Sequence, residues 1–229
     1  MTAWENNSLT ACVYKSLFFK YSWGDSISKA KIQNDIVINY LNCAELKIHP
    51  GFADEIQVMD FGGIDQLSSY LEILKKMANF NRVKNILIVR DAETDAVAAI
   101  NSIRSSLAKN NLSVPPVSNM WESGTPNISY TLFPAFDSQT SGALEDLCLS
   151  IICEPGWEYL NNDIDRFIAN LKEQRERKFP HEFKSKLHTY FSITDSFVSM
   201  KIGEAAKAGA FDWANERINP LHDLIAEKL

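Results

Sequence analysis

No stretch of this sequence stays apolar for the roughly 18 to 20 residues that a membrane-spanning helix requires. The N-terminal residues lack a basic segment followed by an apolar one, which is the pattern of a secretory signal. No P-loop, Gly-x-Gly-x-x-Gly or Gly-x-Ser-x-Gly pattern occurs, and there is neither an internal repeat nor a low-complexity tract. We therefore expect a cytoplasmic protein that does not contact a membrane and that uses none of these motifs.

Cysteine is also scarce, with four residues in the whole chain. The four are Cys12, Cys43, Cys148 and Cys153. They form no Cys-x-x-Cys pair, and their spacing to the four histidines does not match a zinc site. Buried, reduced thiols are therefore expected, and they agree with a reducing compartment.

Apolar residues are plentiful by comparison: 45% of the chain is hydrophobic and 11% is aromatic. A chain of 229 residues with this composition has enough apolar material for a sizeable core, so disorder is excluded as its main state. The net charge of −6 excludes a wholly basic surface for nucleic acid, although it leaves room for a local basic face.

Three segments combine a short apolar run with a following helical pattern. The runs cover residues 56–61, 86–89 and 128–133, and they have the character of strands buried in a parallel sheet. After each run, apolar residues recur at spacings of three and four, which predicts a helix with one buried face. The residues predicted to face inward are Leu67, Tyr70, Leu71, Leu74, Met77 and Ala78, then Ala96, Val97, Ile100, Ile103 and Leu107, then Leu144, Leu147, Cys148, Ile151 and Ile152.

This alternation predicts an α/β fold, with a mostly parallel sheet flanked by helices. Residues 12–19 and 32–41 form a weaker candidate for a fourth strand and helix, and residues 110–127 predict an irregular connection. From Trp157 onward the pattern is helical, and Asn219 with Pro220 predicts an N-cap and first position of a last helix.

The apolar positions predicted for the two longer helices of this part are Trp157, Leu160, Ile164, Phe167, Ile168 and Leu171, then Phe183, Leu187, Tyr190 and Phe191. No flexible linker precedes them. We therefore expect a single domain over residues 1–229, with a core of about residues 1–153. A helical C-terminal extension of about residues 155–229 is expected to pack on the sheet.

Acidic residues gather where the predicted strands end, which is the edge at which open parallel sheets bind ligands. They are Asp60 before Gly62 and Gly63, then Asp91, Glu93 and Asp95, then Asp137, and then Glu145 and Asp146. A single acid at such a junction is explained as a helix N-cap. Asp91, Glu93 and Asp95 are three acids where a cap requires one, and their repulsion favours a bound cation. Carboxylate oxygens suit Mg²⁺ or Mn²⁺.

Two other interpretations of this acidic segment are tested by position. A calcium loop of the EF-hand type requires Gly at its sixth position and Glu at its twelfth, where this chain has Ala96 and Ser102. That interpretation is excluded. A haloacid-dehalogenase-type phosphatase has an Asp nucleophile, a second Asp two residues later and then Thr or Val. Asp91 fits this pattern whereas Glu93 and Asp95 do not, so it stays a minor alternative.

The order of several short motifs resembles an uncharacterised family of bacterial Toprim-like proteins. The motifs are Gly62-Gly63-Ile64-Asp65-Gln66-Leu67, Arg90-Asp91-Ala92-Glu93, Pro134-Ala135-Phe136-Asp137, Gly142-Ala143-Leu144-Glu145-Asp146-Leu147 and Ala210-Phe211-Asp212-Trp213. The similarity spans roughly residues 50 to 229. The Toprim superfamily includes topoisomerases, primases, nucleases of the overcoming-lysogenization-defect type and a ribosomal-RNA maturation nuclease.

The resemblance implies a Toprim-like sheet and assigns roles to the acids. Asp91 and Glu93 would be the catalytic pair that holds Mg²⁺, and Asp137, Glu145 and Asp146 would complete the metal-binding edge. The acidic segment itself adds Asp95 as a further metal-binding candidate. In such folds a Glu after the first strand is a general acid or base, and no such Glu is recognisable here. Residues 17–25 are the best positional match, so either Asp25 replaces the Glu or the catalytic acid is absent.

A basic segment over residues 166–186 offers a possible partner surface. It carries seven basic and three acidic residues, so its local charge is +4 although the whole chain is −6. One interpretation is a solvated helix face, and the other is a track for nucleic-acid phosphates that includes Arg175, Arg177 and Lys178.

Two hypotheses for the function follow from the sequence. The first is Mg²⁺- or Mn²⁺-dependent phosphodiester hydrolysis of nucleic acid, that is, a nuclease. The second is a non-catalytic module that binds a nucleotide, a nucleic acid or a protein and has lost the Toprim glutamate.

Overall fold

The structure of the chain is a computed structural model. It describes residues 31–33, 36–41, 55–59, 64–135, 138–175 and 182–228. Several predicted positions lie outside these residues: Asp60, Gly62, Gly63, Asp137, Arg177, Lys178 and the segments 12–19 and 17–25. The remaining predictions can be compared with the described elements.

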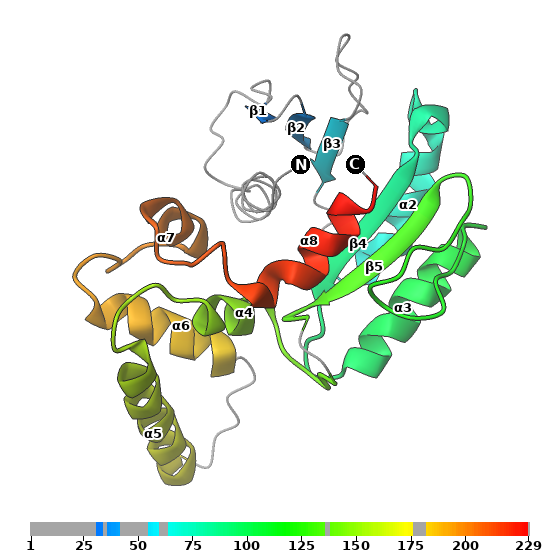
Figure 1. Cartoon of the computed structure of the whole chain (residues 1–229). Coiled ribbons are helices and arrows are strands. Elements are labelled where there is room, and N and C mark those ends of the chain that lie inside the picture. Colours follow the sequence, from blue (N-terminus) through cyan, green and yellow to red (C-terminus); the bar gives the residue numbers. More distant parts are fainter. Residues whose placement is uncertain are drawn as a thin grey trace.

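The elements follow one another along the chain as shown in Figure 1. The strands are β1 (Lys31–Gln33), β2 (Ile36–Leu41), β3 (Glu55–Met59), β4 (Asn85–Asp91) and β5 (Asn127–Phe133). The α-helices are α2 (Leu67–Lys76), α3 (Ala96–Lys109), α4 (Leu144–Ser150), α5 (Trp157–Arg175), α6 (Glu182–Ile193), α7 (Ile202–Ala208) and α8 (Asn219–Ala226). Short 3₁₀ helices are η1 (Ile64–Gln66), η2 (Phe80–Arg82) and η3 (Glu216–Ile218).

The strands form two small sheets in the described part of the chain. β4 and β5 are parallel, with Asn85 opposite Asn127 and Asp91 opposite Phe133. In the other sheet β2 lies between β1 and β3, parallel to β3 and antiparallel to β1. The mixed α/β class and the parallel pairing are therefore confirmed. The expectation of a helix within residues 32–41 is wrong, because the β-branched run of Ile36, Val37 and Ile38 lies in a strand.

Both faces of the β4–β5 pair are covered. On one face α2 and α3 contribute Leu71 and Ile103 to a core with Ile128, Tyr130 and Leu132. Successive residues of a strand point to opposite faces, so Phe133 lies on the other face, in a second core. That core is built largely by α4 to α8, and Figure 1 shows α8 beside the two strands. The predicted packing of the helical extension on the sheet is confirmed.

The helical stripes are largely confirmed, with three errors. Ala78 was predicted to face inward at the end of the first stripe, but it is exposed and lies beyond the end of α2. Leu67, Leu71 and Leu74 of α2 are buried, as are Ile164 and Ile168 of α5 and Leu187, Tyr190 and Phe191 of α6. Val97 of α3 and Phe167 of α5 were predicted to face inward, and they are 66% and 54% exposed. Each lies next to a buried residue, at the edge of the buried face of its helix. That buried face is narrower than the set of apolar residues in the sequence suggests.

Three further expectations can be compared with the described residues. Pro220 lies in the first turn of α8, whereas Asn219 already belongs to that helix and Ile218 is its N-cap. Cys148 is buried, as expected. Cys153 is exposed, so the prediction of a buried thiol is wrong for this residue. None of the described helices is both long enough and apolar enough to cross a membrane.

Candidate functional site

The end of β4 and the start of α4 are joined by backbone hydrogen bonds. The N–H of Ala92 donates to the carbonyl of Phe133 over 3.0 Å, which continues the β4–β5 pairing. Glu93 and Gly142 exchange two hydrogen bonds of 2.7 Å, and Ala96 donates to the carbonyl of Thr140 over 2.8 Å. These bonds hold the turn after β4 against the segment that leads into α4. They bring together acids that are about fifty residues apart in the sequence.

Asp91 is the last residue of β4, and its carboxylate points to the start of α4. Its Oδ1 accepts a hydrogen bond of 2.8 Å from the N–H of Leu144. Burial raises the pKa of Asp91 to about 6, the Leu144 bond opposes this shift, and the charges of Glu145 and Glu93 raise the pKa further. The three acids therefore interact, and the charge of Lys184 lowers the pKa only slightly.

Glu145 is the second buried acid of the site, and 8% of its surface is exposed. Burial raises its pKa, and the charges of Asp146 and Glu93 act in the same direction. A hydrogen bond with its own backbone and the charge of Lys184 oppose them. The Nζ of Lys184 on α6 is 4.0 Å from Oε1 of Glu145, which is too long for a hydrogen bond. Lys184 thus offsets part of the negative charge of Glu145 without forming a hydrogen bond to it.

Asp146 and Asp95 have structural roles at helix starts. The carboxylate of Asp146 accepts a 2.8 Å hydrogen bond from the N–H of Ala143, and that of Asp95 accepts a 3.0 Å bond from Ala98. Asp95 is the N-cap of α3. Burial raises the pKa of Asp146, while the Ala143 bond opposes the rise. Both acids satisfy backbone donors that a helix start leaves without a partner.

Arg90 is a feature of the site that the sequence interpretation missed. Its side chain is 9% exposed, its Nε donates to the carbonyl of Asp91 over 3.3 Å, and its buried Nη1 makes no hydrogen bond. Burial lowers the pKa of Arg90, and the charges of Glu93, Asp91 and Asp65 oppose this. The available signal was a charged residue directly after the apolar run 86–89, because such a residue is costly to bury without nearby charge of opposite sign.

The basic segment is largely committed to ion pairs where the structure describes it. Lys172 pairs with Glu182, and Lys186 pairs with Asp165 over 2.7 Å and with Glu182 over 3.3 Å. Arg166 forms an exposed pair with Asp163. These contacts match the solvated-face interpretation for the described cations. The side chain of Arg175 and all of Arg177 and Lys178 lie outside the described residues, so the phosphate-track prediction stays a prediction for them.

The carboxylates of the described acids have the chemistry of a divalent-cation site, but they are not arranged as one. Asp91, Glu93 and Glu145 offer the hard oxygen ligands that Mg²⁺ prefers, and a cation would relieve the repulsion that helps to raise the pKa values of Asp91 and Glu145. Within the described ranges, however, no three His, Cys, Asp or Glu side chains are grouped closely enough to hold a metal ion.

Comparison with known proteins gives a family but no named relative. A family model described as "Protein of unknown function (DUF3226)" matches residues 30–227. No curated protein and no solved structure matches the chain.

Proposed function

Since this chain belongs to DUF3226, a family described as having unknown function, we propose its function from the geometry of the acidic site. We propose that the protein is a metal-dependent phosphodiesterase. The proposed reaction is Mg²⁺- or Mn²⁺-dependent hydrolysis of nucleic acid by a Toprim-like domain. The observation that carries it is Asp91, whose pKa is about 6 because it is buried beside Glu145 and Glu93 at the carboxyl edge of a parallel strand pair.

Asp91, Glu93 and Glu145 are the residues that would hold the metal, with Asp137 and Asp146 as further candidates. When bound, Mg²⁺ neutralises charge on the scissile phosphate and lowers the pKa of an attacking water. Lys184 lies close enough to Glu145 to balance its charge, and it is free to turn to a substrate phosphate because the present distance is 4.0 Å. Arg90 adds a buried positive charge that interacts with Glu93 and Asp91.

The second candidate is a module of the same fold that binds a nucleotide, a nucleic acid or a protein without turnover. It is favoured by the absence of a preformed group of three metal-binding side chains within the described residues. The carboxylate of Asp91 also accepts a hydrogen bond from the N–H of Leu144, so it has a partner when no ligand is bound. The two candidates differ in whether a bound metal leads to cleavage.

The deciding experiment incubates the purified full chain with labelled single- and double-stranded DNA and RNA, in Mg²⁺, in Mn²⁺ and in EDTA. Wild type is expected to cleave at least one substrate only with metal, and Asp91→Asn is expected to lose at least ~100-fold in rate, since electrostatic groups of this kind contribute that much. Asn keeps an acceptor for the Leu144 N–H, so this variant is expected to fold. Asp163→Asn, on the exposed surface of α5, is the matched control.

Melting curves with and without metal complete the test. Mg²⁺ or Mn²⁺ is expected to raise the melting temperature of wild type and Asp163→Asn, by mass action on the folded state, and not that of Asp91→Asn. A rise in melting temperature without turnover on any substrate would favour the binding module. No rise and no turnover in wild type would overturn the phosphodiesterase proposal and leave the acids as caps and surface charge.

A further inference from the structure

A charged side chain is buried beside an apolar core at the end of β4. Arg90 is 9% exposed, and by the alternation of the strand it points to the same face as Ile88, which belongs to the core covered by α2 and α3. A methionine would fill a similar space there without the cost of burying a charge. Packing alone therefore does not explain an arginine at this position.

The donors of this guanidinium are largely unused. Its Nε donates to the carbonyl of Asp91 over 3.3 Å, which holds the group at the end of β4. Its Nη1 is buried and has no acceptor among the described residues. A buried donor without an acceptor is unfavourable, and folded proteins contain few of them. Such a donor calls for an acceptor that a ligand can supply.

The neighbouring acids do not supply this acceptor. Three of them, Glu93, Asp91 and Asp65, oppose the lowering of the Arg90 pKa through their charges alone. In the part of the chain that the structure describes, no carboxylate forms a hydrogen bond with the guanidinium. An arginine with a purely structural role ordinarily meets a carboxylate in a bidentate pair. The acids therefore offset the charge of Arg90 and leave its donors available.

Arg90 and the metal-binding candidates meet at one edge of the β4–β5 pair. Arg90 and Asp91 are successive residues, so their side chains leave β4 on opposite faces. Glu93, in the turn that follows, interacts with the charges of both. Open parallel sheets bind ligands at this edge. A ligand there lies beside the guanidinium as well as beside the acids.

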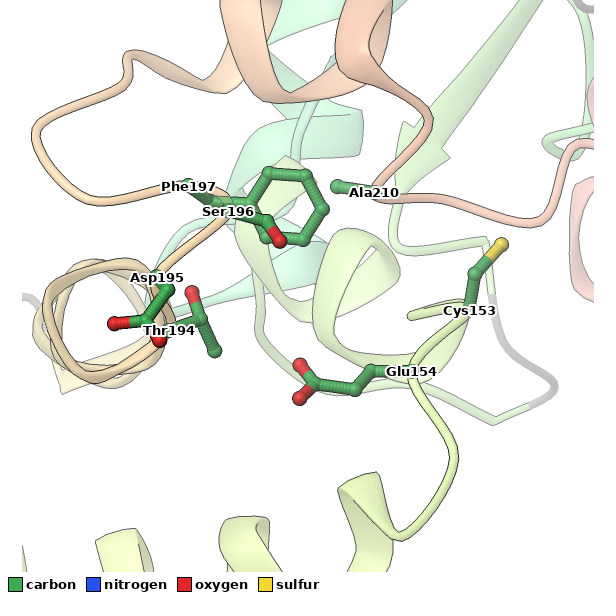
Figure 2. A pocket seen from close by; sticks show the side chains of 7 residues that line it. All are labelled: Cys153, Glu154, Thr194, Asp195, Ser196, Phe197 and Ala210. Carbon is green, nitrogen blue, oxygen red and sulfur yellow. The ribbon is translucent and has the colours of Figure 1, made fainter.

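The hollow between the connections that follow α4 and α6 offers no comparable group. It has a volume of about 380 Å³, and Figure 2 shows the carboxylate of Asp195 turned away from that of Glu154. Both residues are exposed, so water solvates their charges and no ligand is required. Burial without an acceptor distinguishes Arg90 from these two acids.

We propose that Arg90 binds an oxygen of the substrate phosphate at the acidic site. This inference rests on the proposed function, since the phosphate is the one that a metal held by Asp91, Glu93 and Glu145 would contact. The planar guanidinium matches a phosphate in geometry and in charge. The carboxylates repel a phosphate when no cation is present, so binding is expected to be tighter in Mg²⁺ than in EDTA.

The test is calorimetric titration of the full chain with inorganic phosphate in Mg²⁺ and in EDTA, at constant ionic strength. Wild type in Mg²⁺ is expected to bind phosphate saturably, with a Kd on the order of 1 mM or tighter. Arg90→Met is expected to weaken binding ~10-fold or more, because a hydrogen bond to a charged group contributes about that factor. Arg90→Lys keeps the charge without the planar fork and is expected to weaken binding by a smaller factor.

Arg166→Met is the matched control, because it removes an exposed arginine of α5 and is expected to leave phosphate binding unchanged. Melting curves in EDTA separate a ligand contact from a structural role. Arg90→Met is expected to melt at or above the temperature of wild type, since it removes a buried charge that has no bonded partner. A structural arginine would instead lower the melting temperature of both Arg90 variants when replaced.

Absence of saturable phosphate binding to wild type in Mg²⁺, equal binding by wild type and Arg90→Met, or a lower melting temperature for both Arg90 variants would each overturn the proposal. Nucleic-acid cleavage by Arg90→Met at the wild-type rate would also overturn it and leave the phosphodiesterase in place. Phosphate binding that depends on Arg90, without cleavage of any nucleic acid by wild type, would overturn the phosphodiesterase and keep the Arg90 site.

Discussion

Burial keeps the Asp91 carboxyl partly protonated near pH 6, and the charges of Glu145 and Glu93 add to this effect. An acid whose pKa is raised in the folded state stabilises the fold while it is protonated in that state. Its contribution is complete below the pKa of the unfolded chain, near 4, and is lost as the pH rises through about 6. Glu145 and Asp146 have pKa values that are shifted in the same direction, so they add to the same slope.

Asp91→Asn is therefore expected to remove part of the pH dependence of stability. Between pH 5 and pH 7.5 wild type is expected to lose about 1 kcal/mol more of its unfolding free energy than the variant does. Urea denaturation without metal at the two pH values measures this difference, with Asp163→Asn as the control. Parallel curves for wild type and Asp91→Asn would show that Asp91 ionises in the folded state at its ordinary pKa.

Gly142 is the residue that links the turn after β4 to the segment before α4. Its φ of +131° lies in a region that L side chains rarely adopt, and it exchanges two hydrogen bonds with Glu93. A Cβ at this position would lie 2.7 Å from Cδ of Pro134 and 3.1 Å from Oδ2 of Asp146. The conformation and the close approach both require glycine there.

Gly142→Ala is expected to lower the unfolding free energy by ~2–3 kcal/mol, from backbone strain and from the contact with Pro134. Gly209→Ala is the matched control: Gly209 has a φ of +92° but nothing within 4 Å of the position of a Cβ, so a loss of ~1 kcal/mol is expected. Chemical denaturation of both variants gives the comparison. Equal losses would mean that the clash with Pro134 is relieved by small movements.

At the scale of elements, α6 connects the helical extension to the acidic site. Lys184 points to Glu145 on α4, whereas Lys186, two residues further on, pairs with Asp165 on α5 and Glu182. The buried residues Leu187, Tyr190 and Phe191 fix the helix in the core that also contains Leu147 and Cys148 of α4. The position of the Lys184 charge therefore depends on the packing of α6 against α4.

Lys184→Gln is expected to raise the pKa of Glu145, because the lysine charge at 4.0 Å favours the ionised carboxylate. Titration of the side-chain carboxyl carbons by NMR measures this pKa. Lys172→Gln is the control from the same pair of helices, since Lys172 contacts Glu182 instead of the acidic site. An unchanged Glu145 pKa in Lys184→Gln would remove Lys184 from the site.

At the scale of the whole molecule, charge of the two signs is separated along the chain. The basic segment over residues 166–186 carries +4 and the rest of the chain carries −10, which together give the net charge of −6. Apart from Lys184, the described cations of this segment are mostly paired with acids of α5 and α6, so Arg175, Arg177 and Lys178 stay the predicted phosphate contacts outside the acidic site.

Replacement of Arg175, Arg177 and Lys178 by Gln is expected to weaken binding of DNA or RNA and to flatten its dependence on salt concentration. Each lost phosphate contact lowers the slope of log K against log salt by about 0.7–0.9. Fluorescence anisotropy between low and moderate salt measures the slope. The combined replacement of Lys76, Arg104 and Lys109 by Gln is the charge-matched control on α2 and α3. If wild type binds neither nucleic acid at low salt, the solvated-face interpretation alone remains.

Local pattern in the sequence determined most of the elements and much of the core. The apolar runs placed β3, β4 and β5 to within about two residues, and helical spacing identified Leu71, Ile103 and Leu187 as buried positions. This works because helix and strand repeats are fixed by local backbone geometry, so one face of each element is visible in the sequence. The order of acids at the strand ends was visible for the same reason.

Contacts between distant segments decided the rest. Pairing of β3 with β2 instead of β4, the exposure of Val97 and Phe167, and the hollow beside Glu154 depend on which elements meet in space. The pKa of Asp91 depends on burial against α4, and the charge of Lys184 reaches Glu145 only because α6 packs on α4. Burial and electrostatic coupling vary with distance through the folded structure rather than along the chain, so no local pattern specifies them.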